Sequence, residues 1–208
     1  AFDFAWTNTN LLHGQYVRTN ALFDNSLLAP SGPATGLERD LLEPWREQLP
    51  DALFDSLYVW PETDGSGRLR ENLNTAGALL DEAGYVMANG VRRNDEGQTL
   101  TFEIILSDTS QERILLPWIR NLERLGVTGT LRTIDAAQHQ ARISKFDFDA
   151  IVWRWGVSLS PGNEQWIYWG SDAARAPGSR NYAGIADPIL DSLIGSLSDA
   201  RSAQDLIA

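Results

Sequence analysis

An alternation of strand and helix patterns in the middle of the chain is the feature that most constrains the fold. Residues 100–106, 128–134 and 147–155 have strand-like patterns, whereas residues 110–125 and 136–143 have apolar side chains at helical spacing. The order strand, helix, strand, helix, strand is typical of an α/β domain, which we expect to contain a mixed sheet flanked by helices. Ligands of such domains usually bind at the loops that follow the strands.

The rest of the chain predicts further helices and a hairpin. The helix expected over residues 70–83 has apolar side chains every three or four residues and ends at Gly84. Asn89-Gly90 lies between two short strand-like pieces and predicts a β-hairpin. Pro117, inside the helix expected over residues 110–125, predicts a kink. The other expectations are a short helix within residues 1–16, an irregular segment over residues 17–36, two short helical turns over residues 38–48 and a last helix beginning at Asp187-Pro188.

The composition excludes several classes of function. The formal net charge of −11 argues against a nucleic-acid partner, because nucleic-acid binding depends on a basic surface. Cysteine is absent, which excludes thiol catalysis, cysteine zinc sites and disulfides. No apolar run approaches the roughly 20 residues that a membrane span requires. The two histidines, His13 and His139, lack a close metal-type partner, so we expect neither a metal site nor a cofactor.

Residues 146–170 mix aromatic and polar side chains where the third strand is expected to end in a loop. This mixture is typical of a surface that binds an organic ligand, because aromatic faces give apolar contact and polar neighbours fix orientation. The alternative is that two or three of the tryptophans are packing residues and the loop only closes the domain. The aromatic residues after the expected strand core are Trp153, Trp155, Trp166, Tyr168 and Trp169.

Three acidic residues are candidates for catalysis. Asp147 and Asp149 are expected on one face of a strand, about 7 Å apart, and paired carboxylates suit glycosidase-type acid–base chemistry. A half-exposed strand gives the same alternation without any catalysis. Glu164 lies in the aromatic stretch, where a salt bridge or the start of a helix would explain it equally well. The alternatives for function are therefore an acidic hydrolase that uses Glu164 with Asp147 or Asp149, and a carbohydrate-binding module that uses the tryptophans.

Arg154 and Arg180 are candidate anion ligands, because a guanidinium group binds carboxylates and phosphates through a fork of N–H donors. In a chain this acidic, pairing with a neighbouring Asp or Glu explains an arginine equally well. Both interpretations stay open at this point.

Several long segments resemble the family 5 extracellular solute-binding proteins of bacteria, the peptide and nickel class that feeds ABC importers. The segments are FDFAWTNTNLLHGQYVRTNALFDNS, DGSGRLRENLNTAGALLDEAGY, LPWIRNLERLGV, FDFDAIVWRWGVSLSPGNEQWIYWGS and PGSRNYAGIADPILDSLI. They cover nearly the whole chain in one order. The stretch WGVSLSPGNEQ is most similar to the YejA-like branch, which is associated with oligopeptides and microcin C.

The resemblance implies a lobe of the type II periplasmic-binding-protein fold, in a protein whose two lobes close on a ligand around a hinge. Residues 1–208 are expected to form one truncated lobe, the second, with a hinge-proximal helix and extended segment over residues 1–36 and an α/β core over residues 64–200. The chain begins without methionine and stops soon after an amphipathic pattern begins, so we expect a fragment whose signal peptide lies outside it. The implied function is capture of an oligopeptide or peptide conjugate, without catalysis, by a periplasmic monomer that delivers it to ABC permease subunits in the inner membrane.

The resemblance also assigns residues to the ligand. In oligopeptide-binding members, the loop after the corresponding strand supplies a tryptophan and then an acidic residue that pairs with the amino terminus of the peptide. Trp155 matches the tryptophan, but Ser158 occupies the acidic position, and Glu164 is the candidate substitute. Arg180 and Asn181 match a segment that faces the cleft. The expected ligand-binding residues are Trp153, Arg154, Trp155, Gly156, Ser158, Asn163, Glu164, Arg180 and Asn181.

Overall fold

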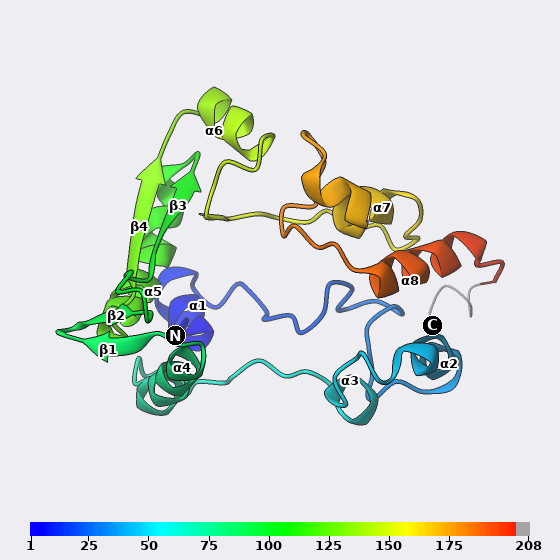
Figure 1. Cartoon of the computed structure of the whole chain (residues 1–208), viewed down its shortest axis with the longest axis horizontal. Coiled ribbons are helices and arrows are strands. Elements are labelled where there is room, and N and C mark those ends of the chain that lie inside the picture. Colours follow the sequence, from blue (N-terminus) through cyan, green and yellow to red (C-terminus); the bar gives the residue numbers. More distant parts are fainter. Residues whose placement is uncertain (203–208) are drawn as a thin grey trace. The chain divides into compact units, whose positions relative to one another are not determined.

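The computed structural model describes residues 1–202, which divide into two compact units (Figure 1). The sheet-bearing unit comprises residues 1–18, 61–143 and 147–153, and the helical unit comprises residues 19–60, residues 144–146 and the chain from residue 154 onward. The amphipathic pattern at the end of the chain lies outside the described residues.

The sheet-bearing unit contains the predicted succession of strands and helices. Its three-stranded sheet is parallel in the order β4-β3-β5, with helices as the connections (Figure 1). The predicted α/β order is therefore confirmed. Its elements are α1 (Phe4–Leu11), α4 (Arg70–Glu82), β1 (Val86–Ala88), β2 (Val91–Arg93), β3 (Thr101–Leu106), η2 (Thr109–Gln111), α5 (Glu112–Arg124), β4 (Thr128–Thr133), α6 (Ala136–Ile143) and β5 (Ala150–Ile151).

The central strand β3 forms the core of this unit. Ile104, Ile105 and Leu106 are all at most 2% exposed, so both faces of the strand are covered, as expected for the middle of a parallel sheet. Ile119 of α5 packs against Ile104 and Leu106 on one face. Helix α5 continues through Pro117, where the sequence predicted a kink. A second cluster, of Leu69, Leu73, Leu125 and Val127, joins α4 to the end of α5.

Arg92 on β2 connects four parts of the sheet-bearing unit through buried polar contacts. Its guanidinium donates to the carbonyl of Leu125 at 2.9 Å and to that of Tyr85 at 2.5 Å, and it pairs with the carboxylate of Asp81 on α4. Its backbone N–H donates to the carbonyl of Gly126 at 2.8 Å. These bonds satisfy the carbonyl at the end of α5, which a helix terminus otherwise leaves without a partner, and a carbonyl in the turn after α4.

The turn at Gly126 allows this approach. Gly126 has a φ of +76°, and a Cβ placed there would lie 2.8 Å from the sulfur of Met87 and 3.0 Å from the backbone nitrogen of Arg92. Glycine is therefore required both for the backbone conformation and for the space. The predicted hairpin is also confirmed, because Asn89 and Gly90 have positive φ values between β1 and β2, as a type I′ turn requires.

The third predicted strand is much shorter than residues 147–155, because only Ala150–Ile151 pairs with β3. Two other hydrogen bonds, one of them to β3, replace the ladder before it. The backbone N–H of Asp147 donates to the carbonyl of Arg142, and the carboxylate of Asp149 accepts the backbone N–H of Glu103 on β3. Phe146 has a φ of +55°, which turns the chain just before this point.

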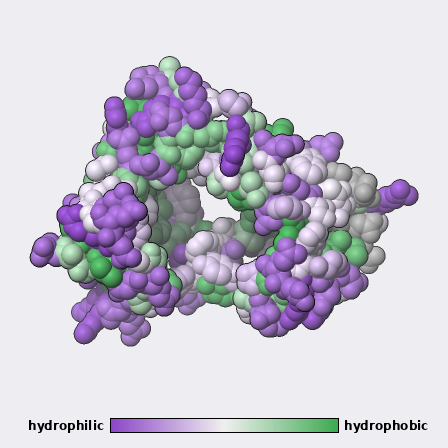
Figure 2. Space-filling view, in the orientation of Figure 1, coloured by the Kyte–Doolittle hydropathy of each residue, from purple (hydrophilic) through white to green (hydrophobic). Residues whose placement is uncertain are grey.

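The helical unit consists of helices joined by irregular segments, without strands among its described residues. Phe54 is buried beneath the guanidinium of Arg46, which lies 4.2 Å from the ring centroid. Asp187 caps the last helix as predicted, by accepting the backbone N–H of Ile189. Figure 2 shows a pale surface over α7, where neutral aromatic residues are frequent. The elements are α2 (Gly36–Leu42), η1 (Glu43–Trp45), α3 (Ala52–Asp55), α7 (Glu164–Trp169), η3 (Ser171–Arg175) and α8 (Pro188–Asp199).

We predict that Arg92→Met lowers the free energy of unfolding by about 2–4 kcal/mol, because it leaves buried carbonyl groups without donors. Urea denaturation followed by circular dichroism measures the change. Arg93→Met is the matched control, since Arg93 is exposed on the same strand and its guanidinium donates only to the carbonyl of Gly97 among the described residues. Equal stability of the two variants would show that the Arg92 contacts are not stabilising.

Candidate functional site

An aromatic cluster lies in the helical unit and is centred on Trp155. The ring centroid of Trp155 is 4.9 Å from that of Trp169, 5.3 Å from that of Tyr168 and 5.8 Å from that of Tyr182. Phe146 joins the cluster through Tyr182, at 6.3 Å. These tilted and edge-on arrangements at 4.5–7 Å are those that aromatic rings prefer. All four rings around the centre are half-buried, so the cluster is both a packing unit and a partly exposed aromatic surface.

Helix α7 positions the rings of Tyr168 and Trp169. The prediction of a loop over these residues was wrong. Gln165 is buried and accepts a hydrogen bond from the indole N–H of Trp169, one helical turn later, at 3.0 Å. Tyr168 and Trp169 therefore lie on a helical face toward Trp155, while Trp166 is 39% exposed. The sequence PGNE before the aromatic residues was the available signal, since it places an acidic residue in the first turn of a helix.

Glu164 begins α7, which is the helix-start role considered for it. Its carboxylate accepts the backbone N–H of Gly162 at 3.0 Å and a side-chain N–H of Gln165 at 3.3 Å. The pKa of Glu164 lies below its ordinary value, chiefly because its own backbone N–H also bonds to the carboxylate, with Gly162 and Gln165 adding to the effect. A carboxylate held ionised in this way is a poor general acid.

Asn181 is fully buried and joins the end of α7 to the approach to α8. Its amide group donates to the carbonyls of Gly170 at 3.1 Å and Ile185 at 2.7 Å, and its oxygen accepts the backbone N–H of Ile185 at 3.0 Å. The side chain thus supports the backbone between Arg180 and Tyr182. Its expected direct contact with a ligand stays a prediction.

Arg180 lies at the edge of the aromatic cluster. Its backbone N–H donates to the carbonyl of Ile167 at 3.3 Å, and its guanidinium donates to the hydroxyl of Tyr168 at 3.5 Å. The pKa of Tyr182 is raised, chiefly by burial, and the positive charge of Arg180 partly offsets that rise. Arg180 therefore faces the aromatic surface while its side chain remains exposed.

The loop from residue 154 to residue 163 presents four of the expected ligand residues at the surface. Arg154, Gly156, Ser158 and Asn163 are exposed. The hydroxyl of Ser158 accepts the backbone N–H of Ser160 at 3.1 Å, which holds a local turn. A Cβ placed on Gly156 would meet no atom within 4 Å, so the space beside the tryptophan is open.

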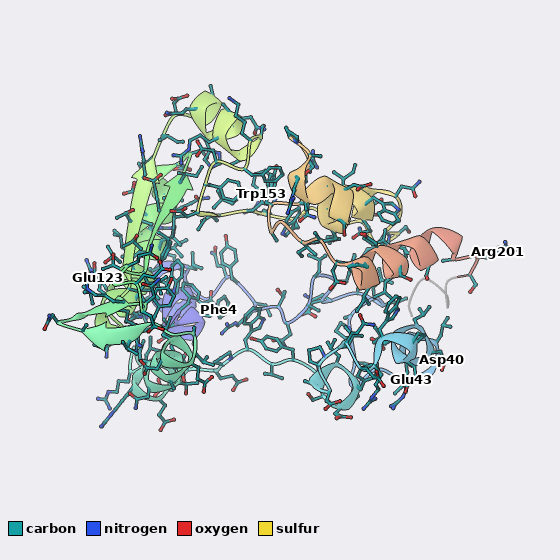
Figure 3. The ribbon with its side chains drawn as sticks, in the orientation of Figure 1. Phe4, Asp40, Glu43, Glu123, Trp153 and Arg201 are labelled. Atoms are coloured by element: carbon teal, nitrogen blue, oxygen red, sulfur yellow. The ribbon has the colours of Figure 1, made fainter. Side chains whose placement is uncertain are left out.

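The other predicted residues belong to the sheet-bearing unit, where Trp153 lies on the stretch after β5 and is 39% exposed (Figure 3). Asp147 and Asp149 each have a separate partner. Asp147 pairs with Arg142 at 3.1 Å, and Asp149 accepts the backbone N–H of Glu103. The pKa of Arg142 is raised, chiefly by its hydrogen bond to Glu103, so it remains charged beside Asp147. The hydrolase interpretation receives no support from this arrangement.

Among residues 1–202, no group of three metal-binding side chains comes together. None of the described helices is both long enough and apolar enough to cross a membrane.

The chain is similar to a known family and to several of its relatives. The family model described as "Bacterial extracellular solute-binding proteins, family 5 Middle" matches residues 1–176. Over the whole chain, identity is 40% to a binding protein of Brucella melitensis. It is 41% to the peptidoglycan-binding protein YepA of Agrobacterium fabrum and 38% to the protein of that organism named "Probable peptide-binding protein YejA". The chain spans 34% of the length of each relative.

Solved structures give the same fold. The oligopeptide-binding protein AppA from Bacillus subtilis, solved with a nonapeptide, aligns with 98% of this chain at a TM-score of 0.67 and 16% identity. NikA from Brucella suis, solved with Fe(III)-EDTA, aligns with all of it at a TM-score of 0.62 and 21% identity. The chain covers 36% of each of these proteins. The likeness confirms the predicted periplasmic-binding-protein-like fold of type II.

We predict that Asn181→Ala lowers the free energy of unfolding by about 2–4 kcal/mol, because it leaves two carbonyls and one N–H of the backbone without partners. Urea denaturation monitored by tryptophan fluorescence would report the loss. Asn20→Ala is a matched control in the same unit, since Asn20 is exposed and its hydrogen bond to Asp24 uses the backbone. A loss no larger than that of the control would contradict the structural role of Asn181.

Proposed function

This chain belongs to the bacterial extracellular solute-binding proteins of family 5, and from that premise we propose that the full-length protein is the substrate-binding component of an ABC importer. It captures oligopeptides or peptide conjugates in the periplasm, as a monomer, and delivers them to permease subunits of the inner membrane. Since the chain spans about a third of its relatives, the proposal concerns the whole protein of which these residues are a part.

The observation that supports a peptide ligand is the Trp155-centred cluster with exposed polar groups beside it. Half-buried rings offer apolar surface without further ordering of the protein, and Arg154, Ser158 and Asn163 add hydrogen-bonding groups on the neighbouring loop. Ligand sites in proteins typically combine a mainly apolar lining with a few fixed polar groups. A peptide has both kinds of group along one chain.

Recognition of a free peptide amine by this loop is not part of the proposal. Ser158 has no charge, and one carboxylate oxygen of Glu164 is already used by Gly162 and Gln165. The expectation that Glu164 replaces the acidic residue of other family members therefore has little support. The ligand is instead oriented by groups other than its amino terminus.

The relatives' names point to two related ligand sets. One relative is named as peptide-binding and another as peptidoglycan-binding, at nearly equal identity to this chain. Peptidoglycan includes short peptide stems, so both names are consistent with a peptide ligand. A useful ligand panel therefore contains ordinary oligopeptides and peptidoglycan stem peptides.

We predict that isothermal titration calorimetry of the full-length protein gives saturable binding with at least one peptide of this panel. Trp155→Ala weakens that binding roughly 10-fold or more, because the centre of the aromatic surface is removed. Recovery of the unchanged peptide after binding supports the absence of catalysis. Heat with sugars or metal ions only, and none with any peptide, would refute the peptide assignment.

The open space at Gly156 gives a second test. We predict that Gly156→Leu leaves the free energy of unfolding within about 0.5 kcal/mol of wild type, because a Cβ at this position meets no atom within 4 Å apart from its chain neighbours. The leucine side chain nevertheless reduces peptide affinity, because it occupies space beside Trp155. Gly32→Leu is the matched control, since a Cβ at Gly32 in the same unit also meets no atom within 4 Å. Unchanged peptide affinity in Gly156→Leu would place the ligand elsewhere.

A further inference from the structure

Two arginines beside the aromatic cluster have no carboxylate partner. None of the ion pairs among residues 1–202 involves Arg154 or Arg180, and both side chains are exposed. The alternative explanation of these residues, pairing with a neighbouring Asp or Glu, is therefore not realised in the described part of the chain. Their charges remain available to a ligand.

The segment that carries the two arginines is less acidic than the chain as a whole. The formal net charge of the protein is −11, whereas residues 154–182 contain three arginines against two carboxylates. One of those two carboxylates, that of Glu164, is engaged by the loop before α7. The carboxylate of Asp191 on α8 also lies against this stretch, because it accepts the backbone N–H of Ser171 at 2.9 Å. The preference for an anion therefore rests on the two guanidinium groups without a carboxylate partner and not on a net positive charge.

Arg180 is the better placed of the two arginines. Its backbone is fixed by the bond to Ile167 and by the buried neighbour Asn181, so the side chain starts from a defined position. The long contact with Tyr168 uses one of its five N–H donors, and the others have no partner among the described residues. A planar fork with free donors beside an aromatic surface matches a carboxylate attached to an apolar or peptide body.

A phosphate group fits this site less well. Bound phosphate usually uses several backbone N–H groups at a loop or helix start. Here the N–H of Gly162 before α7 already donates to Glu164, which fills that position. The available donors are guanidinium groups, so the match is to a monoanionic carboxylate.

We propose that Arg180, with Arg154, selects ligands that carry a free carboxylate, either at the carboxyl terminus of a peptide or on an acidic side chain. This inference rests on the proposed function, because it names the ligand class of the same site. In oligopeptide-binding members, the acidic residue at the position of Ser158 pairs with the positive amino terminus of the peptide. The arginines of this protein favour a negative group instead. The protein then orients its ligand by the negative group and not by the amine.

The test uses calorimetry on the full-length protein with three peptides of equal length. These are the amidated peptide Ala-Phe-Gln-Ala, the same peptide with a free carboxyl terminus, and amidated Ala-Phe-Glu-Ala. We expect one or both acidic peptides to bind wild type more tightly than the neutral one. We expect Arg180→Ala to weaken binding of the preferred acidic peptide roughly 10- to 100-fold, and to weaken binding of the neutral peptide by a much smaller factor.

Two further variants make the result specific. Arg180→Lys should retain part of the preference, since it keeps the charge and loses the fork. Arg175→Ala removes an exposed arginine from the same segment, residues 154–182. It should change neither the affinity for the acidic peptide nor that for the neutral peptide. If Arg175→Ala and Arg180→Ala weaken binding of the acidic peptide equally, the preference comes from the general positive charge of the arginines and not from a specific site. That result would overturn the inference.

The outcomes separate this inference from the proposed function. Equal binding of all three peptides by wild type, or an unchanged preference in Arg180→Ala, overturns carboxylate selection and leaves peptide binding intact. Binding of a phosphoserine peptide in preference to both acidic peptides also overturns it. No binding of these three peptides or of the wider panel would overturn both proposals.

Discussion

The buried guanidinium of Arg92 is the interaction on which the sheet-bearing unit most depends. It satisfies carbonyls that belong to the end of α5 and to the turn after α4, and its carboxylate partner lies on α4 itself. The backbone of the same residue bonds to Gly126 and Leu100. A charged group taken out of water costs free energy unless it is paired and hydrogen-bonded, and here Nε and Nη1 donate at the places where elements meet. Through Leu100 and Gly126 these contacts reach the residues just before β3 and β4.

Much of this architecture was predictable because local patterns agree with the final packing. The helical spacing of Leu73 and its neighbours, the Asn89-Gly90 turn and the cap at Asp187 each appear in the structure as the sequence indicates. The length of β5 was not predictable. Alternation of Phe and Asp predicts a strand, but the carboxylate of Asp149 takes the backbone N–H that a longer ladder would have used. Asp149 and Glu103 are 46 residues apart in the sequence. The local sequence around Asp149 therefore does not indicate that its side chain will replace a hydrogen bond of the strand.

The candidate site was only partly predictable for a similar reason. Trp155 was identified from the aromatic stretch, and the structure places it at the centre of a cluster. Phe146 and Tyr182 reach the cluster from segments outside the loop, which spacing along the chain does not reveal. The role of Glu164 in starting α7 and the burial of Asn181 also depend on tertiary contacts. Residue type indicated which groups are chemically able to bind a ligand, and packing determined which of them remain available.

In residues 180–182, support of the backbone and contact with the aromatic surface are carried out by different residues. The amide of Asn181 fixes the backbone, while the residues on either side of it, Arg180 and Tyr182, present their side chains to the aromatic surface. Because the support comes from position 181, the flanking positions can change chemistry without a change in chain path. Diversification of ligand preference among proteins built on this segment then requires no new loop. A substitution at one flanking position is enough to exchange a positive group for a neutral or negative one on an unaltered scaffold.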